Sequence, residues 1–176
     1  SRDKPLLLLH IGAERTIFYI HWGGSPVYAR ELMWGGRDLS TAICRKYGIP
    51  IEQAEQTKRD SGFVLSPSQR PQATPEQIEF SDTLLQPLEE LLHEIRQSKL
   101  ICKNVTHEPL TNICLTGSTS LLPGLSGLIE EEINVPTKTL HGLSTLAASG
   151  VTYSEQTDAT FLLAASIALC LVGPER

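Results

Sequence analysis

The stretch PLLLLHIGAERTIFYIHWGGSPVYARELMWGG, residues 5–36, carries the clearest fold signal in the sequence. It opens with a nearly continuous apolar run from Pro5 to Gly12, which is typical of a central strand. An aromatic and β-branched run from Arg15 to His21 follows one short turn. After a second turn at Gly23 to Ser25, the residues from Pro26 to Trp34 alternate moderately. Three strands joined by two short turns predict an antiparallel meander.

The residues after the meander have the pattern of two short helices. Asp38 is expected to cap a helix over Leu39 to Tyr47, which ends at Gly48. A second helix is expected over Ile51 to Asp60, ending at Gly62. Glu52 lies in its first turn, and Lys58 and Arg59 lie late, as the helix dipole prefers.

A linker-like stretch from Ser66 to Pro75 contains three prolines and predicts a mobile surface loop. Apolar residues at helical spacing then predict a long amphipathic helix from about Pro75 to Lys99 or slightly beyond. Pro87 lies inside this pattern, so one kinked helix and two separate helices both remain open.

The last third of the chain continues with alternating strands and helices. We expect strands at residues 110–115 and 135–140, with a helix at 121–133 between them. A final buried helix, capped by Thr157 or Asp158, is expected to run through Val172.

Composition excludes several classes of protein. A chain of 176 residues can form one sizeable domain or two small lobes, and a net charge of -5 argues against a nucleic-acid surface. The four cysteines and five histidines show no metal-binding spacing, so we expect free thiols and no metal site. The apolar run from Phe161 to Val172 is too short to span a bilayer, so we expect no direct membrane insertion. Walker A, GxGxxG and GxSxG motifs are absent from the sequence.

Three glycine-bearing turns remain as candidate ligand sites. They are Gly12–Ala13, Gly35–Gly36 and Gly117–Ser118, each of which follows a predicted strand. Free N–H groups at a helix start suit an anion, and a missing side chain lets a ligand approach the backbone. Any one of these turns could simply connect two elements of secondary structure. The order of the three along the chain says more about function than any single turn does.

In that order the motifs resemble those of the actin-like ATPase superfamily, and specifically the PilM-type proteins of type IV pilus assembly. The DIGxxxT turn of that family corresponds to His10–Gly12 with Thr16. Its strand ending in R-x-aliphatic-x-x-GG corresponds to Arg30 through Gly36, and its AE-x-x-K helix to Ala54 through Lys58.

The resemblance extends over nearly the whole chain. NICLTGSTSLLPGL, residues 112–125, is similar to the family's adenosine segment, and FLLAASIALCLVG, residues 161–173, is similar to its closing helix. The resemblance implies an α/β, actin-like (ribonuclease H-like) lobe, with 1–176 as the second lobe of the domain. Residues 1–34 and 105–176 would form its sheet subdomain and 35–104 a mainly helical insertion, with the first lobe outside this sequence.

The resemblance also implies where a nucleotide would lie. In the family, the DxG turn touches phosphate and metal-bound water, the E-x-x-K helix lies along the adenosine, and the GG loop cradles the ribose and adenine side. Carried onto this sequence, the contacting residues are Gly12, Ala13, Glu55, Lys58, Gly117, Ser118 and Thr119.

Two departures from the family pattern weaken that site. His10 stands where the family has an aspartate, and a neutral imidazole is a poor ligand for a hard cation. Ser118 stands where the family has a second glycine, and its Cβ limits both positive φ and close ligand approach. We therefore expect a vestigial site without nucleotide hydrolysis, with ATP binding as the alternative.

The resulting hypothesis is a non-catalytic, cytosolic actin-like scaffold at the inner membrane, serving type IV pilus assembly or type II secretion. Its expected partners are inner-membrane pilus or secretion components and an assembly ATPase, with self-association left open. The lost carboxylate fits the GspL-like branch of type II secretion, whereas the AE-x-x-K segment fits the PilM branch. A nucleotide-binding actin-like ATPase and an FtsA-like polymerising protein are the alternatives.

Overall fold

The computed structural model describes residues 4–140 of the chain. The expected helix through Val172 lies outside the described residues. Within residues 4–140, no helix has the length and apolar character needed to cross a membrane.

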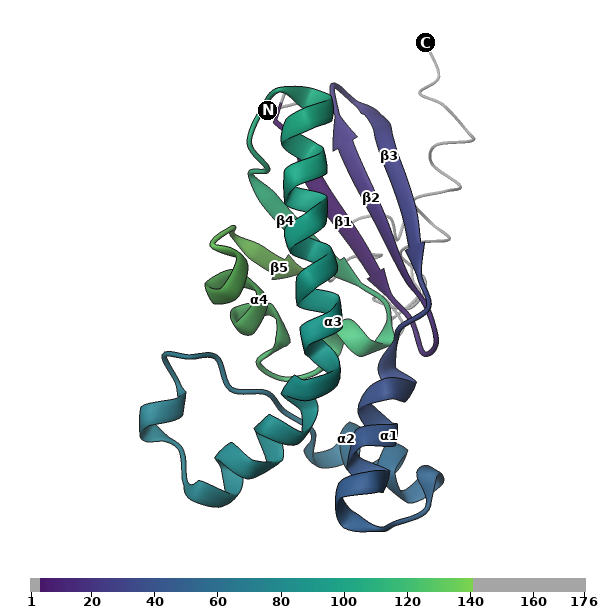
Figure 1. The fold of residues 1–176 in the computed structure, drawn as a ribbon, viewed down its shortest axis with the longest axis vertical. Coiled ribbons are helices and arrows are strands. Elements are labelled where there is room, and N and C mark those ends of the chain that lie inside the picture. The colour runs from purple at the N-terminus through teal and green to yellow at the C-terminus, as the bar shows by residue number, and fades with distance from the viewer. Residues whose placement is uncertain (1–3, 141–176) are drawn as a thin grey trace, which may run out of the picture.

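One five-stranded sheet organises the described part of the chain (Figure 1). The strands are β1 (Leu6–Ile11), β2 (Thr16–Trp22), β3 (Ser25–Leu32), β4 (Asn112–Thr116) and β5 (Thr137–Thr139). Their order is β3-β2-β1-β4-β5. The pairs β1–β2 and β2–β3 are antiparallel, which confirms the predicted meander. The pairs β1–β4 and β4–β5 are parallel, so the chain makes the α/β architecture that the sequence predicts.

The helices fill the connections between these strands. They are α1 (Gly36–Tyr47), α2 (Ile51–Ser61), α3 (Pro75–Thr106) and α4 (Leu125–Ile133), with short 3-10 helices η1 (Arg70–Gln72) and η2 (Ser118–Leu121). The helix predicted at 121–133 thus begins later than expected, after the turn at Pro123–Gly124.

The helix α3 is a single helix of 32 residues that continues through Pro87 (Figure 1). This settles the two possibilities left open by the sequence. Thr74 caps its start through a capping box with Gln77, and His107 ends it in the left-handed conformation at φ 58°. The indole Nε1 of Trp34 donates to the carbonyl of Pro87 over 2.8 Å, which fixes the middle of the helix to the end of the meander.

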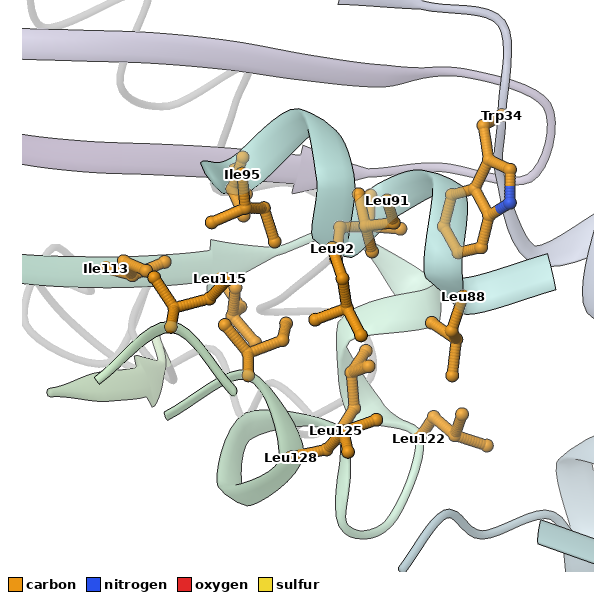
Figure 2. Packing of buried hydrophobic residues seen from close by; sticks show 14 of the residues in the cluster. Trp34, Leu88, Leu91, Leu92, Ile95, Ile113, Leu115, Leu122, Leu125 and Leu128 are labelled. Atoms are coloured by element: carbon orange, nitrogen blue, oxygen red, sulfur yellow. The ribbon is translucent and has the colours of Figure 1, made fainter. Parts of the chain in front are cut away.

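The hydrophobic core lies between α3 and one face of the sheet. Strand β1 places alternate side chains on that face, and Leu7, Leu9 and Ile11 are fully buried. Figure 2 shows apolar side chains of α3 packed toward those of β4 and α4. The labelled residues of these three elements are Leu88, Leu91, Leu92, Ile95, Ile113, Leu115, Leu125 and Leu128.

The start of α1 differs from the prediction. Gly35 caps the helix and Asp38 is its third residue, so the prediction of Asp38 as the cap was wrong. The Asp38 carboxylate instead accepts a hydrogen bond from the Gly35 N–H over 2.8 Å. A Cβ at Gly35 would lie 2.6 Å from the backbone of Ala13, in the turn between β1 and β2. This close contact excludes a larger residue at the capping position.

The proline-containing stretch from Ser66 to Pro75 forms hydrogen bonds with α4. It contains η1, and the side chain of Glu131 in α4 accepts hydrogen bonds from the hydroxyls of Ser66 and Ser68. Ser66 is buried, which a sequence pattern of prolines and polar residues does not reveal.

Candidate functional site

Three segments far apart in the sequence meet at one end of the sheet. Because β1 and β4 are parallel neighbours, the turns that follow them lie side by side. The carbonyl of Gly12 accepts hydrogen bonds from the N–H of Gly36 over 3.0 Å and from the hydroxyl of Thr119 over 2.9 Å. The carbonyl of Ala13 accepts from the N–H of Arg37 over 2.7 Å. In open α/β sheets, ligands bind outside the carboxyl ends of strands, which is where these turns meet.

At two positions of this region, neighbouring protein atoms leave no room for any residue larger than glycine. A Cβ on Gly36 would lie 2.5 Å from the Oγ1 of Thr119 and 3.1 Å from the Nζ of Lys58. Gly117 has φ 88°, and a Cβ there would lie 2.4 Å from the carbonyl oxygen of Ile11. The glycine pattern therefore follows from close packing of the turns, whether or not a ligand approaches them.

Lys58 connects α2 to the start of α1. Its ammonium group donates to the carbonyl of Gly36 over 2.6 Å, to the hydroxyl of Ser40 over 2.9 Å and to the carboxylate of Glu55 over 2.7 Å. A lysine ammonium has three N–H donors, so these three acceptors use its full capacity. The Lys58 side chain is only 10% exposed.

Glu55 is the acceptor at the centre of this network. Its carboxylate accepts hydrogen bonds from Lys58, from Ser40 and, over 3.0 Å, from the exposed Arg59. Burial alone would raise the pKa of Glu55, but the hydrogen bonds from Lys58 and Ser40 outweigh it and lower this pKa to about 2. The carboxylate is therefore ionised at neutral pH and remains partly exposed.

His10 lies near the end of β1 and is directed at β4. Its Nδ1 is 3.1 Å from the hydroxyl of Thr116, and the two atoms share a hydrogen bond. Burial lowers the pKa of His10, which favours the neutral imidazole. Across residues 4–140, no group of three or more His, Cys, Asp or Glu side chains is arranged to hold a metal ion.

Ser118 opens η2 directly after Gly117, and its side chain is exposed. Among the described residues that carry a side chain, only His107 and Asn134 have positive φ. The backbone at Ser118 therefore accepts a Cβ without strain, and the expected conflict with positive φ does not arise. Its other expected effect, on the approach of a ligand, stays a prediction.

The structure brings together the turns and helices that the sequence singled out. Gly12, Ala13, Gly117 and Thr119 lie in or beside the meeting point of the turns, and Glu55 and Lys58 join it through Gly36. Sequence reasoning missed Ser40, which is buried between Lys58 and Glu55. Its position four residues after Gly36, on the helix face that carries buried residues, was the available signal. The assignment of nucleotide contacts to the seven predicted residues stays a prediction.

Comparison with known proteins identifies the family. The family model described as type IV pilus assembly protein PilM matches residues 1–171. The chain belongs to the PilM family. A chain of the solved PilM-PilN type IV pilus biogenesis complex is 26% identical, with a TM-score of 0.71. That match covers 98% of this chain and 47% of the solved one.

More distant structures share the fold. MreB5 of Spiroplasma citri, solved with AMPPNP, has a TM-score of 0.61 at 14% identity, and the match covers 94% of this chain and 54% of MreB5. The ethanolamine utilization protein EutJ from Carboxydothermus hydrogenoformans has a TM-score of 0.52 at 21% identity over 91% of this chain and 50% of EutJ. With the PilM match, these neighbours show that the fold is actin-like.

The chain is also similar to a cell division protein. The cell division protein FtsA of Borreliella burgdorferi is 25% identical over 152 residues, which are 78% of this chain and 37% of FtsA. The PilM-family chain described here thus spans about half or less of the relatives that it matches.

Proposed function

We propose that this PilM-family chain is the second lobe of a non-catalytic actin-like scaffold in type IV pilus assembly. The observation that carries the proposal is the network around Lys58, whose three donors are all satisfied by Gly36, Ser40 and Glu55. A lysine that binds phosphate or adenine must give up at least one such bond. The residue therefore stabilises the lobe itself, which is what a scaffold requires.

The environment of His10 supports the absence of hydrolysis. Nucleotide hydrolysis in this fold depends on a hard cation, for which oxygen ligands are preferred. Near the end of β1 this chain offers an imidazole that hydrogen-bonds to Thr116 and whose pKa burial lowers, which favours its neutral form. Neither group supplies the charge of the aspartate that the family pattern has there.

The PilM-PilN complex supports a PilN-type inner-membrane component as the partner. This partner would hold the scaffold at the cytoplasmic face of the inner membrane. The same proposal includes two further interactions of the scaffold: contact with an assembly ATPase, and self-association. A role in type II secretion is the narrower alternative, and the family match to a pilus assembly protein favours the pilus.

The test uses the full-length protein that contains both lobes. We expect the wild type to release no phosphate from Mg-ATP above the background of a buffer control, while it binds the PilN-type component. The variant His10→Asp restores the carboxylate at β1, and its release of phosphate is compared with that of the wild type. Magnesium-dependent turnover by the wild type would contradict the non-catalytic assignment, and failure to bind the PilN-type component would contradict the scaffold.

Nucleotide binding without hydrolysis is the second candidate. It is favoured by the ionised and partly exposed carboxylate of Glu55, which can accept a further hydrogen bond from a hydroxyl group. Calorimetric titration of ATP into the full-length protein tests it. Micromolar binding that Glu55→Gln abolishes would support this candidate, and an absence of heat would remove it. Similarity to FtsA also keeps polymerisation as an alternative, which sedimentation with and without ATP would test.

A further inference from the structure

Within residues 4–140, the chain passes between two structural units at two places. After β3 it enters α1, α2 and the first half of α3, residues 36–86, which we call the helical unit. It leaves this unit at Pro87 and continues into the second half of α3, which packs on the sheet. The second half of α3, the five strands, η2 and α4 form what we call the sheet unit. The two crossing points are therefore the segment 34–36 and Pro87.

Contacts inside the helical unit join its helices to the loop from Gly62 to Thr74. Lys46 of α1 pairs with Glu79 of α3 over 2.7 Å. The N–H of Leu65 in the loop donates to the Oγ of Ser81 in α3 over 2.9 Å. Three aromatic rings from α1, the loop and α3 also contact one another: Tyr47, Phe63 and Phe80. With these contacts, residues 36–86 can move as one body.

The two crossing points meet at Trp34. Its indole Nε1 donates to the carbonyl of Pro87 over 2.8 Å, and its own carbonyl accepts from the hydroxyl of Thr16 over 2.9 Å. Pro87 has no N–H, so the carbonyl of Thr83 lacks the donor that normally lies four residues further along a helix. Helices bend where such a bond is missing. An axis through Trp34 and Pro87 therefore has the features of a hinge.

One carboxylate of α4 joins the two units on another side. Glu131 accepts hydrogen bonds from the N–H of Ser68 over 3.0 Å and from the hydroxyls of Ser66 and Ser68. These bonds lower the pKa of Glu131, so the carboxylate is ionised at neutral pH. Within residues 4–140, the other hydrogen bond between the units on this side runs from the N–H of Val64 to the carbonyl of Pro123 over 2.9 Å. In the view of Figure 1, α4 lies to the left of α3 and α1 to its right.

The boundary between the units passes through the candidate site. Glu55 and Lys58 lie in the helical unit, whereas the other residues assigned to a nucleotide lie in the sheet unit. The two units approach closely here, since a Cβ on Gly36 would lie 2.5 Å from the Oγ1 of Thr119. Rotation about the hinge widens this approach. It leaves the Lys58 network intact, because the partners of Lys58 all belong to the helical unit.

We propose that the helical unit pivots about Trp34 and Pro87, and that Glu131 is the latch that holds it closed against α4. Breaking the bonds from Glu131 to the loop releases one side of the unit, while the contacts at the hinge keep it attached. This inference does not depend on the proposed scaffold function, because it concerns a motion within the lobe.

The test measures distances between pairs of spin labels in the full-length protein by pulsed electron paramagnetic resonance. The labels are attached through an unnatural amino acid, so that the native cysteines stay in place. The labelled positions are exposed: Gln53 in α2, Glu76 in α3 and Gly127 in α4. Gly127 can carry a side chain, because a Cβ there meets no atom within 4 Å. The pairs 53–127 and 76–127 connect the two units, and the pair 53–76 lies within the helical unit.

Removing the latch should displace the helical unit as a whole. In Glu131→Ala we expect the population displaced from the main wild-type distance to rise at least about threefold in both pairs that connect the units, in line with the loss of hydrogen bonds to a carboxylate. The pair 53–76 should keep its wild-type distance. Adding Pro87→Ala supplies the missing N–H in α3 and should narrow the distances between the units again.

Glu130→Ala is the matched control. It also removes an exposed glutamate of α4, but the hydrogen bond that it breaks comes from the N–H of Thr137, within the sheet unit. We expect wild-type distances in this variant. Unchanged distances between the units in Glu131→Ala, or equal displacement in Glu130→Ala, would overturn the latch. A broadened 53–76 distance would overturn the rigid unit, and no narrowing by Pro87→Ala would overturn the hinge.

Discussion

The ammonium group of Lys58 donates a hydrogen bond to the main-chain carbonyl of Gly36 over 2.6 Å. The contact joins α2 to the first residue of α1, where the N–H of Gly36 already bonds to Gly12. A lysine that the family resemblance assigns to the nucleotide thus holds together the protein's own turns and helices.

Replacing Lys58 should destabilise the lobe. Lys58→Met removes the donor to Gly36, Ser40 and Glu55 and leaves those acceptors partly buried, so we expect the free energy of unfolding to fall by about 1–3 kcal/mol. Urea denaturation measures this change. Arg59→Met is the control, because Arg59 bonds to the same carboxylate from a 69% exposed position and should cost less than about 1 kcal/mol. Equal losses in the two variants would refute the special role of Lys58.

Gly36 and Thr119 should be energetically coupled. Gly36→Ala places a Cβ against the Thr119 hydroxyl, so it should destabilise the protein, and Thr119→Ala should relieve part of that loss. We expect a coupling energy of about 0.5–3 kcal/mol in a double-mutant cycle from urea denaturation. Gly127→Ala, in a helix where a Cβ meets no atom within 4 Å, should instead be stabilising by about 0.5–1 kcal/mol. Strict additivity of the first two changes would disprove the contact.

The stability of the lobe should depend on the ionisation of Glu55. Its pKa in the folded protein is about 2, below its ordinary value of 4.5, so the unfolded state binds the proton more readily. The contribution of Glu55 is therefore complete above about pH 4.5 and is lost as the pH falls toward about 2. Denaturation at several pH values should show the difference between wild type and Glu55→Gln shrinking over this window. A difference that stays constant with pH would count against the depressed pKa.

The packing of α3 on the sheet predicts a sharp contrast between two leucines of the same helix. Leu91 is fully buried, whereas Leu100 is 58% exposed. Leu91→Ala should lower the free energy of unfolding by about 2–5 kcal/mol because it leaves a cavity in the core. Leu100→Ala should change it by no more than about 0.5 kcal/mol. Similar effects of both substitutions in urea denaturation would mean that α3 packs with a different face.

Much of the fold follows from local patterns in the sequence. The meander from Leu6 to Leu32 was predictable because alternation and glycine turns are local signals. The continuation of α3 through Pro87 was not, because a proline in a helical pattern permits either outcome until tertiary contacts decide. One such contact is the hydrogen bond from Trp34 to the Pro87 carbonyl, between residues 53 positions apart.

The candidate site was predictable as a set of turns but not as a network. The glycines at 12, 36 and 117 are visible in the sequence, and the parallel pairing of β1 with β4 brings their turns together. The internal partners of Lys58 depend on how α2 packs on α1, which no local pattern encodes. Ser40 was missed because a serine within a helix normally faces solvent, although its spacing from Gly36 placed it on the buried face of α1.

The most direct test of the account is a calorimetric titration of the PilN-type inner-membrane component into the full-length protein, with and without Mg-ATP. A scaffold held together by its own Lys58 network should bind this partner saturably and with the same affinity in both conditions. Binding that requires Mg-ATP, or no binding in either condition, would contradict the central claim.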